Sequence, residues 1–391
     1  MPIINRIAEF HDEITEWRQD IHAHPELLFD VHRTAGLVEE KLREFGVDEI
    51  VAGIGRTGVV GVIKGNDTSS GKVIGLRADM DALPIHEIVH RPYMSRFDGV
   101  MHACGHDGHT AMLLGAAKYL AETRNFDGTA VVIFQPAEEG GGGGKEMVDE
   151  GMMDRFGIQE VYGLHNAPGI PTGEFAIRPG PLMAAADLFE IKIEAVGGHA
   201  AKPHLSNDPI IVGTHIVQAL QTIVSRNADP LEAAVVSVTQ FSAGDTFNVI
   251  PHTATLTGTA RTLTPEMRDL VEKRMGEVVE NVATAFGAKA ELHYHRNYPV
   301  TANHDAQTAF AASVAREVAG EGRVDDDTPP VMGGEDFSFM LEARPGAFIF
   351  LGQGDTPNVH HPEYDFNDDI IPFGCSYWAK LVETAMPAKQ A

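Results

Sequence analysis

The chain of 391 residues has few cysteines, few basic residues and no long apolar segment. Its two cysteines, Cys104 and Cys375, cannot build a disulfide framework, so a reducing, cytoplasmic compartment is expected. Thirty basic residues against 56 acidic ones give a net charge of −26, which argues against nucleic acid or an anionic membrane as a partner. No apolar run approaches the ~20 residues of a membrane span, and neither a span nor a signal peptide is expected.

The order of expected elements places the chain in the α/β class. Apolar residues at helical spacing predict a first helix over residues 3–21. Short apolar runs rich in β-branched residues then alternate with helical patterns, which indicates a doubly wound, mixed sheet with mainly parallel strands. The strands are expected at 59–64, 73–79, 129–134 and 160–165, and the helices at 35–45, 108–123 and 145–150.

The pattern changes after residues 179–181. Residues 188–194 alternate apolar and charged side chains, which is typical of a half-exposed strand. Further elements are expected at 208–226, 233–241, 253–261, 266–286 and 289–295, in the order βαββαβ of a ferredoxin-like domain. Residues 182–296 are therefore predicted to be an inserted domain, and residues 1–181 and 297–391 to form one split α/β domain. The α/β pattern resumes with elements expected at 306–319, 347–351 and 371–385.

The stretch from His102 to His109 concentrates groups that can bind a divalent metal. Cys104 and His106 can reach one ion from a tight turn because Gly105 between them permits unusual backbone angles. Two other interpretations remain open. The stretch could be a polar loop with a buried structural thiol, or Cys104 could be a nucleophile with His106 as its base.

Three further clusters support a metal site. A predicted strand leads into Glu138 and Glu139, which five glycines follow; one glutamate can bind metal while the other transfers protons. The simpler interpretation is a solvated acidic turn. His165 ends another predicted strand, and His360 lies far downstream, beyond the expected insertion. Each histidine alone is more often structural, but strand ends in open α/β sheets are where ligands bind.

Taken together, six motifs resemble the hippurate hydrolase and plant auxin-amide hydrolase branch of the aminoacylase/carboxypeptidase metallohydrolases. They are Gly75–Pro84, His102–His109, Phe134–Gly140, Gly163–His165, Gly197–Ala201 and Gly333–Phe337. The resemblance implies an amidohydrolase that cleaves N-acyl amino acids into a carboxylic acid and a free amino acid with two divalent metal ions. It also implies a homodimer, or a higher homo-oligomer, through the inserted dimerisation and lid domain.

The resemblance also assigns roles in the split domain. It makes Glu138 the general base, and it places five residues on the metals: Cys104, His106, Glu139, His165 and His360. His361 is the alternative to His360 as the fifth metal ligand. Many relatives carry a histidine where this chain has Arg77, two residues before Asp79, and Cys104 is expected to replace that ligand. A thiolate favours zinc, while carboxylate and imidazole also suit manganese, nickel or cobalt.

In the inserted domain, His199 is expected to reach the active site of the partner subunit and stabilise the oxyanion. Asn248, Arg261 and Gly334 are the implied substrate contacts, and Asp79 and Glu335 are expected to support the ligands from behind. Arg261 offers the planar fork that a carboxylate prefers, although a strand-end arginine can also be merely exposed.

Two other functions compete with that of an amidohydrolase. A dipeptidase or aminopeptidase of the same superfamily needs a site that accepts a charged N-terminus. A non-catalytic metal or ligand binder would have no use for a general base, so the presence of Glu138 argues against it.

Overall fold

The computed structural model describes residues 3–389, which divide into two compact units. Unit 1 runs to Leu182 and resumes with Ala302–Pro329 and again from Asp336. Unit 2 comprises Met183–Thr301 together with Pro330–Glu335. The short return at 330–335 was not expected from the sequence, because it has neither the strand nor the helix periodicity.

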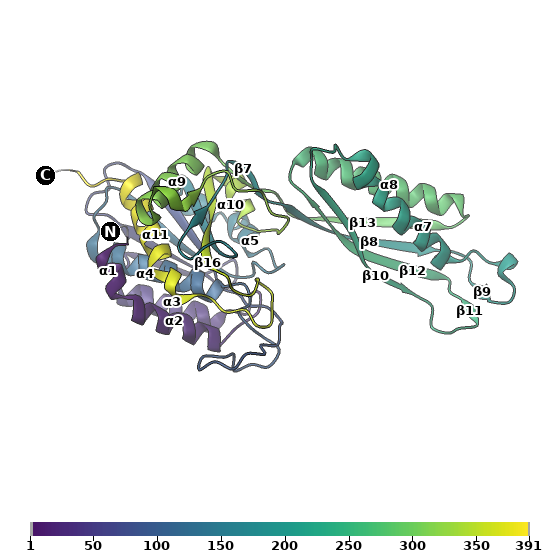
Figure 1. Ribbon diagram of the computed structural model, residues 1–391, viewed down its shortest axis with the longest axis horizontal. Helices are drawn as coiled ribbons and strands as arrows, with labels where there is room; N and C mark the ends of the chain where they lie inside the picture. The colour runs from purple at the N-terminus through teal and green to yellow at the C-terminus, as the bar shows by residue number, and fades with distance from the viewer. Residues whose placement is uncertain (1–2, 390–391) are drawn as a thin grey trace. The chain divides into compact units, whose positions relative to one another are not determined.

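An eight-stranded mixed sheet forms the centre of unit 1, in the order β1-β2-β4-β3-β5-β16-β6-β15 (Figure 1). The strands are β1 (Glu49–Ile54), β2 (Gly58–Lys64), β3 (Val73–Asp79), β4 (Thr129–Gln135), β5 (Glu160–Pro168), β6 (Phe175–Ala176), β15 (Val324–Asp325) and β16 (Gly346–Gly354). Strands β4, β3, β5 and β16 are parallel, while β1 and β2 add antiparallel strands at one edge. This arrangement confirms the predicted α/β class with a mixed sheet.

Helices cover both faces of this sheet. They are α1 (Asn5–Glu9), α2 (His11–Ala23), α3 (His32–Glu44), α4 (His106–Thr123), α5 (Gly143–Asp149), α6 (Met152–Arg155), α9 (Asp305–Ala319), α10 (Ser338–Ala343) and α11 (Ile371–Ala385). On β2, a Cβ at Gly61 would meet Leu42 of α3, and one at Gly58 would meet Met147 of α5. These glycines are three residues apart on a strand, so α3 and α5 lie on opposite faces.

The single helix predicted over residues 3–21 is wrong, because it is interrupted at Phe10. The Phe10 N–H bonds to the carbonyl of Ile7, three residues back, so α1 closes in a tighter turn and α2 begins afterwards. Ile7, Phe10 and Ile14 are all buried. The apolar spacing therefore identified the buried face correctly, although it did not reveal the break.

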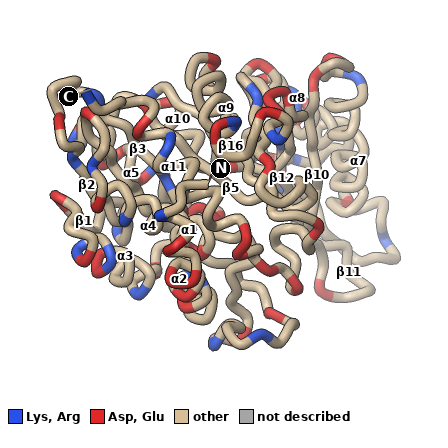
Figure 2. Tube along the Cα trace, turned by 60° about the vertical axis from the view of Figure 1, so that its left-hand side comes forward, with Lys and Arg blue, Asp and Glu red and all other residues tan. Residues whose placement is uncertain are grey.

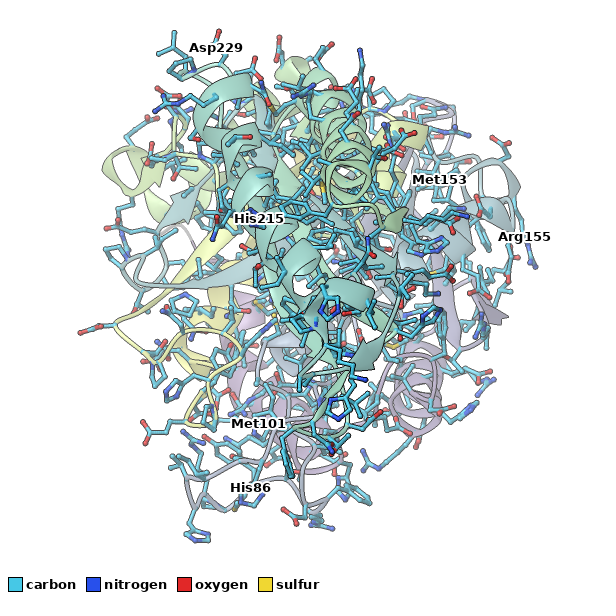
Figure 3. The ribbon with its side chains drawn as sticks, turned by 90° about the vertical axis from the view of Figure 1, so that its right-hand side faces the viewer. His86, Met101, Met153, Arg155, His215 and Asp229 are labelled. Carbon is cyan, nitrogen blue, oxygen red and sulfur yellow. The ribbon has the colours of Figure 1, made fainter. Side chains whose placement is uncertain are left out.

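Unit 2 contains a four-stranded antiparallel sheet in the order β10-β12-β8-β13. Its elements follow the chain as β8 (Ala185–Glu194), α7 (Pro209–Thr222), β10 (Ala234–Ala243), β12 (Thr253–Thr262), α8 (Pro265–Ala285) and β13 (Lys289–Tyr298), which is the order βαββαβ. Helices α7 and α8 lie along one face of the sheet (Figure 1). On α7, His215 stacks on Phe286 with ring centroids 4.6 Å apart; Figure 3 labels His215.

Two short ribbons complete the strand pairing. In unit 2, β9 (Gly198–His199) pairs with β11 (Val249–Ile250), and near the unit boundary β7 (Gly180–Met183) pairs with β14 (Thr301–Asn303).

Acidic residues are spread over the helices of both units, and basic residues lie among them (Figure 2). Within residues 3–389, no helix has both the length and the apolar character that crossing a bilayer requires.

Candidate metal centre and active site

Three adjacent parallel strands of unit 1 deliver polar side chains to one edge of the sheet. Strand β3 lies between β4 and β5, and all three point the same way. Asp79 ends β3, Glu138 follows the end of β4, and His165 lies in the last part of β5. The carboxyl ends of parallel strands are where open α/β sheets bind ligands. The strand with His165 continues to Pro168, three residues beyond its expected end.

Cys104 lies in the turn before α4, and this turn depends on Gly105. Gly105 adopts φ +95°, and a Cβ there would lie 2.2 Å from Oδ1 of Asn166. A side chain at this position would therefore collide with β5 as well as strain the backbone. The helix begins at His106, two residues earlier than expected, so His106 and His109 share its first turn.

The five residues proposed as metal ligands form overlapping groups whose ligand atoms lie within 4.8 Å of one another. The groups are Cys104, His106 and His165; Cys104, Glu139 and His360; and His106, Glu138 and Glu139. Cys104 Sγ lies 3.4 Å from His165 Nε2, and Glu139 Oε1 lies 3.2 Å from His360 Nε2. As the fifth metal ligand, the geometry favours His360 over His361, because the Nδ1 of His361 accepts the backbone N–H of Glu363.

Backbone carbonyls set the ring orientation of two of these histidines. His106 Nδ1 lies 2.8 Å from the carbonyl oxygen of Asp81, and His165 Nδ1 lies 2.7 Å from that of Asn166. A carbonyl can only accept, so each Nδ1 carries a proton, and the Nε2 of a neutral ring then presents a lone pair. That tautomer is the one a metal-binding imidazole needs.

One buried atom in this cluster fits a bound cation. His106 Nε2 is buried and makes no hydrogen bond within the described residues. It lies 3.7 Å from an Asp79 carboxylate oxygen and 4.0 Å from Glu139 Oε1. A buried polar atom without a partner is costly, and a cation between His106 and these carboxylates would satisfy it.

The electrostatics of Cys104 agree with a role as ligand. Burial, and then the nearby carboxylates of Glu139, Glu138 and Asp79, raises the pKa of the thiol well above its usual value. The thiolate therefore needs a cation beside it, and Cys104 is poorly suited to act as a nucleophile on its own. Burial lowers the pKa of His165 well below its usual value, which keeps this imidazole neutral.

Several contacts that support this cluster were not expected from the sequence. His109 Nδ1 lies 2.6 Å from Asp79 Oδ1, and its Nε2 accepts the N–H of Asn166, so both ring nitrogens are occupied within the protein. The buried Arg77 guanidinium donates to Asp79 (2.7 Å) and Asp336 (2.9 Å). The spacing of His106 and His109, three residues apart on a helix, was the one available signal.

The proposed substrate residues of unit 2 divide between two places. His199 pairs with Val249 in the β9–β11 ribbon, and the Asn248 carbonyl accepts the N–H of Ala200, so His199 and Asn248 lie close together. His199 is exposed, and its Nδ1 accepts the N–H of Ala201 at 3.1 Å. That bond leaves the proton of the neutral ring on Nε2, where it can be donated.

Arg261 lies on β12, and no salt bridge to it is present among residues 3–389. Its Nη1 contacts the Thr259 hydroxyl and donates to the Ala260 carbonyl, and burial lowers the pKa of its guanidinium. Gly334 and Glu335 lie on the returning segment, where the Glu335 carbonyl accepts a hydrogen bond from the Thr301 hydroxyl.

Comparisons with known proteins agree with this site. Residues 75–384 match the family described as peptidase family M20/M25/M40. The chain is 43% identical over 381 residues to the hippurate hydrolase of Campylobacter jejuni, covering 97% of this chain and 98% of that protein. It is 40% identical to the N-acetylcysteine deacetylase of Bacillus subtilis, over 95% of this chain and 96% of that one.

A solved structure is similar throughout. A dinuclear metal-binding peptidase of the M20 family from Bacillus subtilis matches with a TM-score of 0.84 at 35% identity, covering 98% of this chain and 100% of that one. The chain belongs to peptidase family M20/M25/M40. It is therefore a hydrolase of amide bonds, and the resemblance drawn from its motifs is confirmed.

Proposed function

We propose that this protein is a metal-dependent amidohydrolase that cleaves N-acyl amino acids into a carboxylic acid and a free amino acid. The observation that carries the proposal is the convergence of Cys104, His106, Glu139, His165 and His360, with Glu138 in an overlapping group. Five ligand side chains of these types suit two divalent cations with a shared ligand. The names of the relatives at 40–43% identity support an N-acyl amino acid as the substrate.

The reaction needs a nucleophile, an activated carbonyl and a proton for the leaving amine. When bound, the cations would supply Lewis acidity, which activates a water molecule and polarises the amide carbonyl. Glu138, buried beside Glu139, takes a proton from the attacking water and returns it to the amide nitrogen. The C–N bond then breaks, and the acyl carbon keeps the oxygen of the water.

Substrate recognition is assigned to unit 2. The guanidinium of Arg261 is half-buried, and the carboxylate of Asp187 acts on it without forming a salt bridge, so the guanidinium can still bind the α-carboxylate of the amino acid. Asn248 and Gly334 would contact the same substrate. The Nε2–H of His199 is a donor for the oxyanion that develops on the carbonyl. We propose that it serves the site of a partner subunit in a homodimer.

The donor set narrows the choice of metal. One thiolate with three imidazoles and a carboxylate suits zinc best, and manganese, nickel and cobalt remain compatible. Cys104 must stay reduced to bind any of them, and both cysteines are free in the structure. A reducing, cytoplasmic compartment fits that requirement.

The test combines metal analysis with a substrate panel. Purified protein is assayed for bound metal and for release of amino acid from benzoyl-glycine, N-acetyl amino acids and indole-acetyl amino acids, with glycyl-glycine as the comparison. We expect hydrolysis of at least one N-acyl substrate, little hydrolysis of glycyl-glycine, and loss of activity on chelation. Preferential hydrolysis of glycyl-glycine would instead indicate a dipeptidase, and tight metal binding without turnover would indicate a binding protein.

A further inference from the structure

Only three large hydrophobic side chains are exposed among the described residues of unit 1. They are Leu28 (41%), Ile88 (49%) and Phe97 (52%). The N–H of Ala82 donates to the carbonyl of Glu26 at 2.8 Å, so the chain segments that carry Leu28 and Ile88 lie side by side. These two residues also contact segments that carry proposed functional residues.

Leu28 lies beside the turn that carries the proposed base. Its carbonyl accepts the backbone N–H of Ala137, the residue before Glu138, at 3.1 Å. Leu28 adopts φ +50°, a backbone region that glycine occupies without strain and that residues with a Cβ seldom occupy. A leucine that is both strained and exposed adds little to the stability of the fold, and strained residues cluster at ligand sites. This combination favours a role of the side chain in ligand binding.

Ile88 lies beside the segment that carries His360. Its backbone N–H donates to the carbonyl of Pro362 at 3.2 Å. The side chain of His360 is 51% exposed, while that of Glu139, its neighbour at 3.2 Å, is 12% exposed. The metal cluster therefore opens to solvent at His360, with Ile88 near this opening. A substrate reaches the cluster from this side.

An N-acyl amino acid has chemically different groups on the two sides of its amide bond. The α-carboxylate needs a cation, and Arg261 of unit 2 is proposed to bind it. The acyl chain is apolar, and moving it from water onto an apolar surface is favourable in proportion to the area buried. The side chains of Leu28 and Ile88 have neither charge nor hydrogen-bonding groups, so they suit the acyl chain and not the carboxylate.

We propose that Leu28 and Ile88 bind the acyl chain of the substrate and make the enzyme selective for apolar acyl groups larger than acetyl, such as hexanoyl or benzoyl. The inference rests on the proposed function and deepens it by naming the substrate class. Each methylene buried against the two side chains should raise kcat/KM about fourfold. An acetyl group has no chain beyond its methyl group to bury there, so N-acetyl-glycine should be the poorer substrate.

Leu28→Gly is the variant to test. Glycine suits φ +50°, so the variant should unfold thermally close to the wild type although it lacks the side chain. Steady-state kinetics are measured with N-acetyl-, N-butanoyl-, N-hexanoyl- and N-benzoyl-glycine. We expect kcat/KM to fall about 10-fold for the hexanoyl and benzoyl substrates and less than about twofold for N-acetyl-glycine. Ile88→Ser should change the preference in the same direction.

Phe97→Ser is the matched control. Phe97 is exposed as well, but its ring packs near His24, with ring centroids 6.5 Å apart, and its backbone hydrogen bonds stay within residues 95–100. Its variant should keep the wild-type ratio of kcat/KM between hexanoyl- and acetyl-glycine. If Leu28→Gly and Ile88→Ser keep that ratio too, the acyl-binding role is overturned. If the wild type hydrolyses none of these amides, the proposed function fails instead, so the two failures are distinguishable.

Folding and assembly are measured on the same preparations. Leu28→Asn is a second variant, because asparagine also tolerates this backbone region and is polar; it should show the same loss for the hexanoyl substrate. If neither Leu28 variant folds, Leu28 is a structural residue and the proposal is overturned. The other candidate occupant of this surface is a second copy of the chain. If light scattering shows a changed oligomeric state while the substrate ratio stays at the wild-type value, the surface is an interface between copies, and the acyl-binding role is again overturned.

Discussion

Arg18 on α2 binds Asp368 through two hydrogen bonds of 2.7 Å each, although the two residues are 350 positions apart in the sequence. The Arg18 side chain is fully buried, and its guanidinium lies 4.4 Å from the centre of the Tyr93 ring. Asp368 lies in the segment between His360 and α11. The pair therefore holds the segment after His360, the fifth proposed metal ligand, against helix α2.

Arg18→Lys should destabilise the protein by about 2–4 kcal/mol. A lysine keeps the charge but cannot form the two-pronged contact with Asp368 or stack on Tyr93, so a fully buried cation loses part of its compensation. Urea unfolding of the metal-free protein measures the effect. Arg6→Lys is the control: its pairs with Glu9 and Glu122 are exposed, so its change should stay below about 1 kcal/mol. Equal effects for the two variants would contradict the assignment.

Glu138→Gln should abolish turnover while metal content stays at the wild-type level. Loss of a general base typically lowers kcat by about 10²–10⁴-fold. Elemental analysis and steady-state kinetics on the same preparation provide the measurement. Glu146→Gln, which removes only an ion pair with the exposed Arg56, should leave both values unchanged. If Glu138→Gln keeps near-full kcat, another group is the base.

Cys104→Ala should lower metal content as well as activity, because a direct ligand is removed. Cys375→Ala is the matched control: this buried thiol donates to the Met112 carbonyl, and it belongs to no potential ligand group among the described residues. That control should lose some stability and keep its metal. A Cys104→Ala protein with full metal content but no activity would instead favour the nucleophile interpretation.

The buried His22 should make stability depend on pH. Burial lowers its pKa, but the carboxylates of Asp107 (2.8 Å) and Glu87 (3.4 Å) outweigh this and raise it to about 9. The charged form therefore stabilises the fold fully below pH ~6.5, and this contribution is lost as the pH rises through about 9, by about 3 kcal/mol in total. Unfolding in the presence of a chelator, compared with His22→Gln, measures it. Parallel pH profiles for the two proteins would refute the prediction.

Complementation tests whether His199 acts across a dimer interface. His199→Ala and Glu138→Gln, each expected to be inactive alone, are mixed under conditions of subunit exchange. If His199 serves the partner subunit, each heterodimer contains one site with both groups intact, and activity returns. If verified heterodimers remain inactive, His199 acts within its own chain or has no catalytic role. For His199→Ala itself, kcat should fall more than KM rises.

The sequence predicted the central strands and most helices closely, because buried apolar runs bounded by turn residues have few alternative structures. Strand β3 was predicted at its observed bounds, 73–79. The edge strand β1 was missed because its side chains are mostly exposed or half-buried and carry no alternation. The two-residue strands β6 and β15 are too short to leave a periodic pattern.

The candidate site was predictable where its chemistry lies in side chains of unusual types. The side chains of Cys104, His106 and the pair Glu138 and Glu139 can bind metal or transfer protons, so the sequence alone marks them as candidates. Asp81 and Arg18 are not marked in this way, because their contacts are to backbone N–H groups or to carboxylates hundreds of residues away. Such roles depend on the folded path of the chain, which local sequence patterns do not encode.

The place of β16 in the sheet has a consequence for biosynthesis. This strand lies between β5 and β6, both of which leave the ribosome before all of unit 2, while β16 and His360 come after it. The growing chain must keep a place open beside β5 until the C-terminal segment arrives. Pairing over so long a separation in sequence slows folding, so the metal centre can be completed only late, after synthesis is nearly finished.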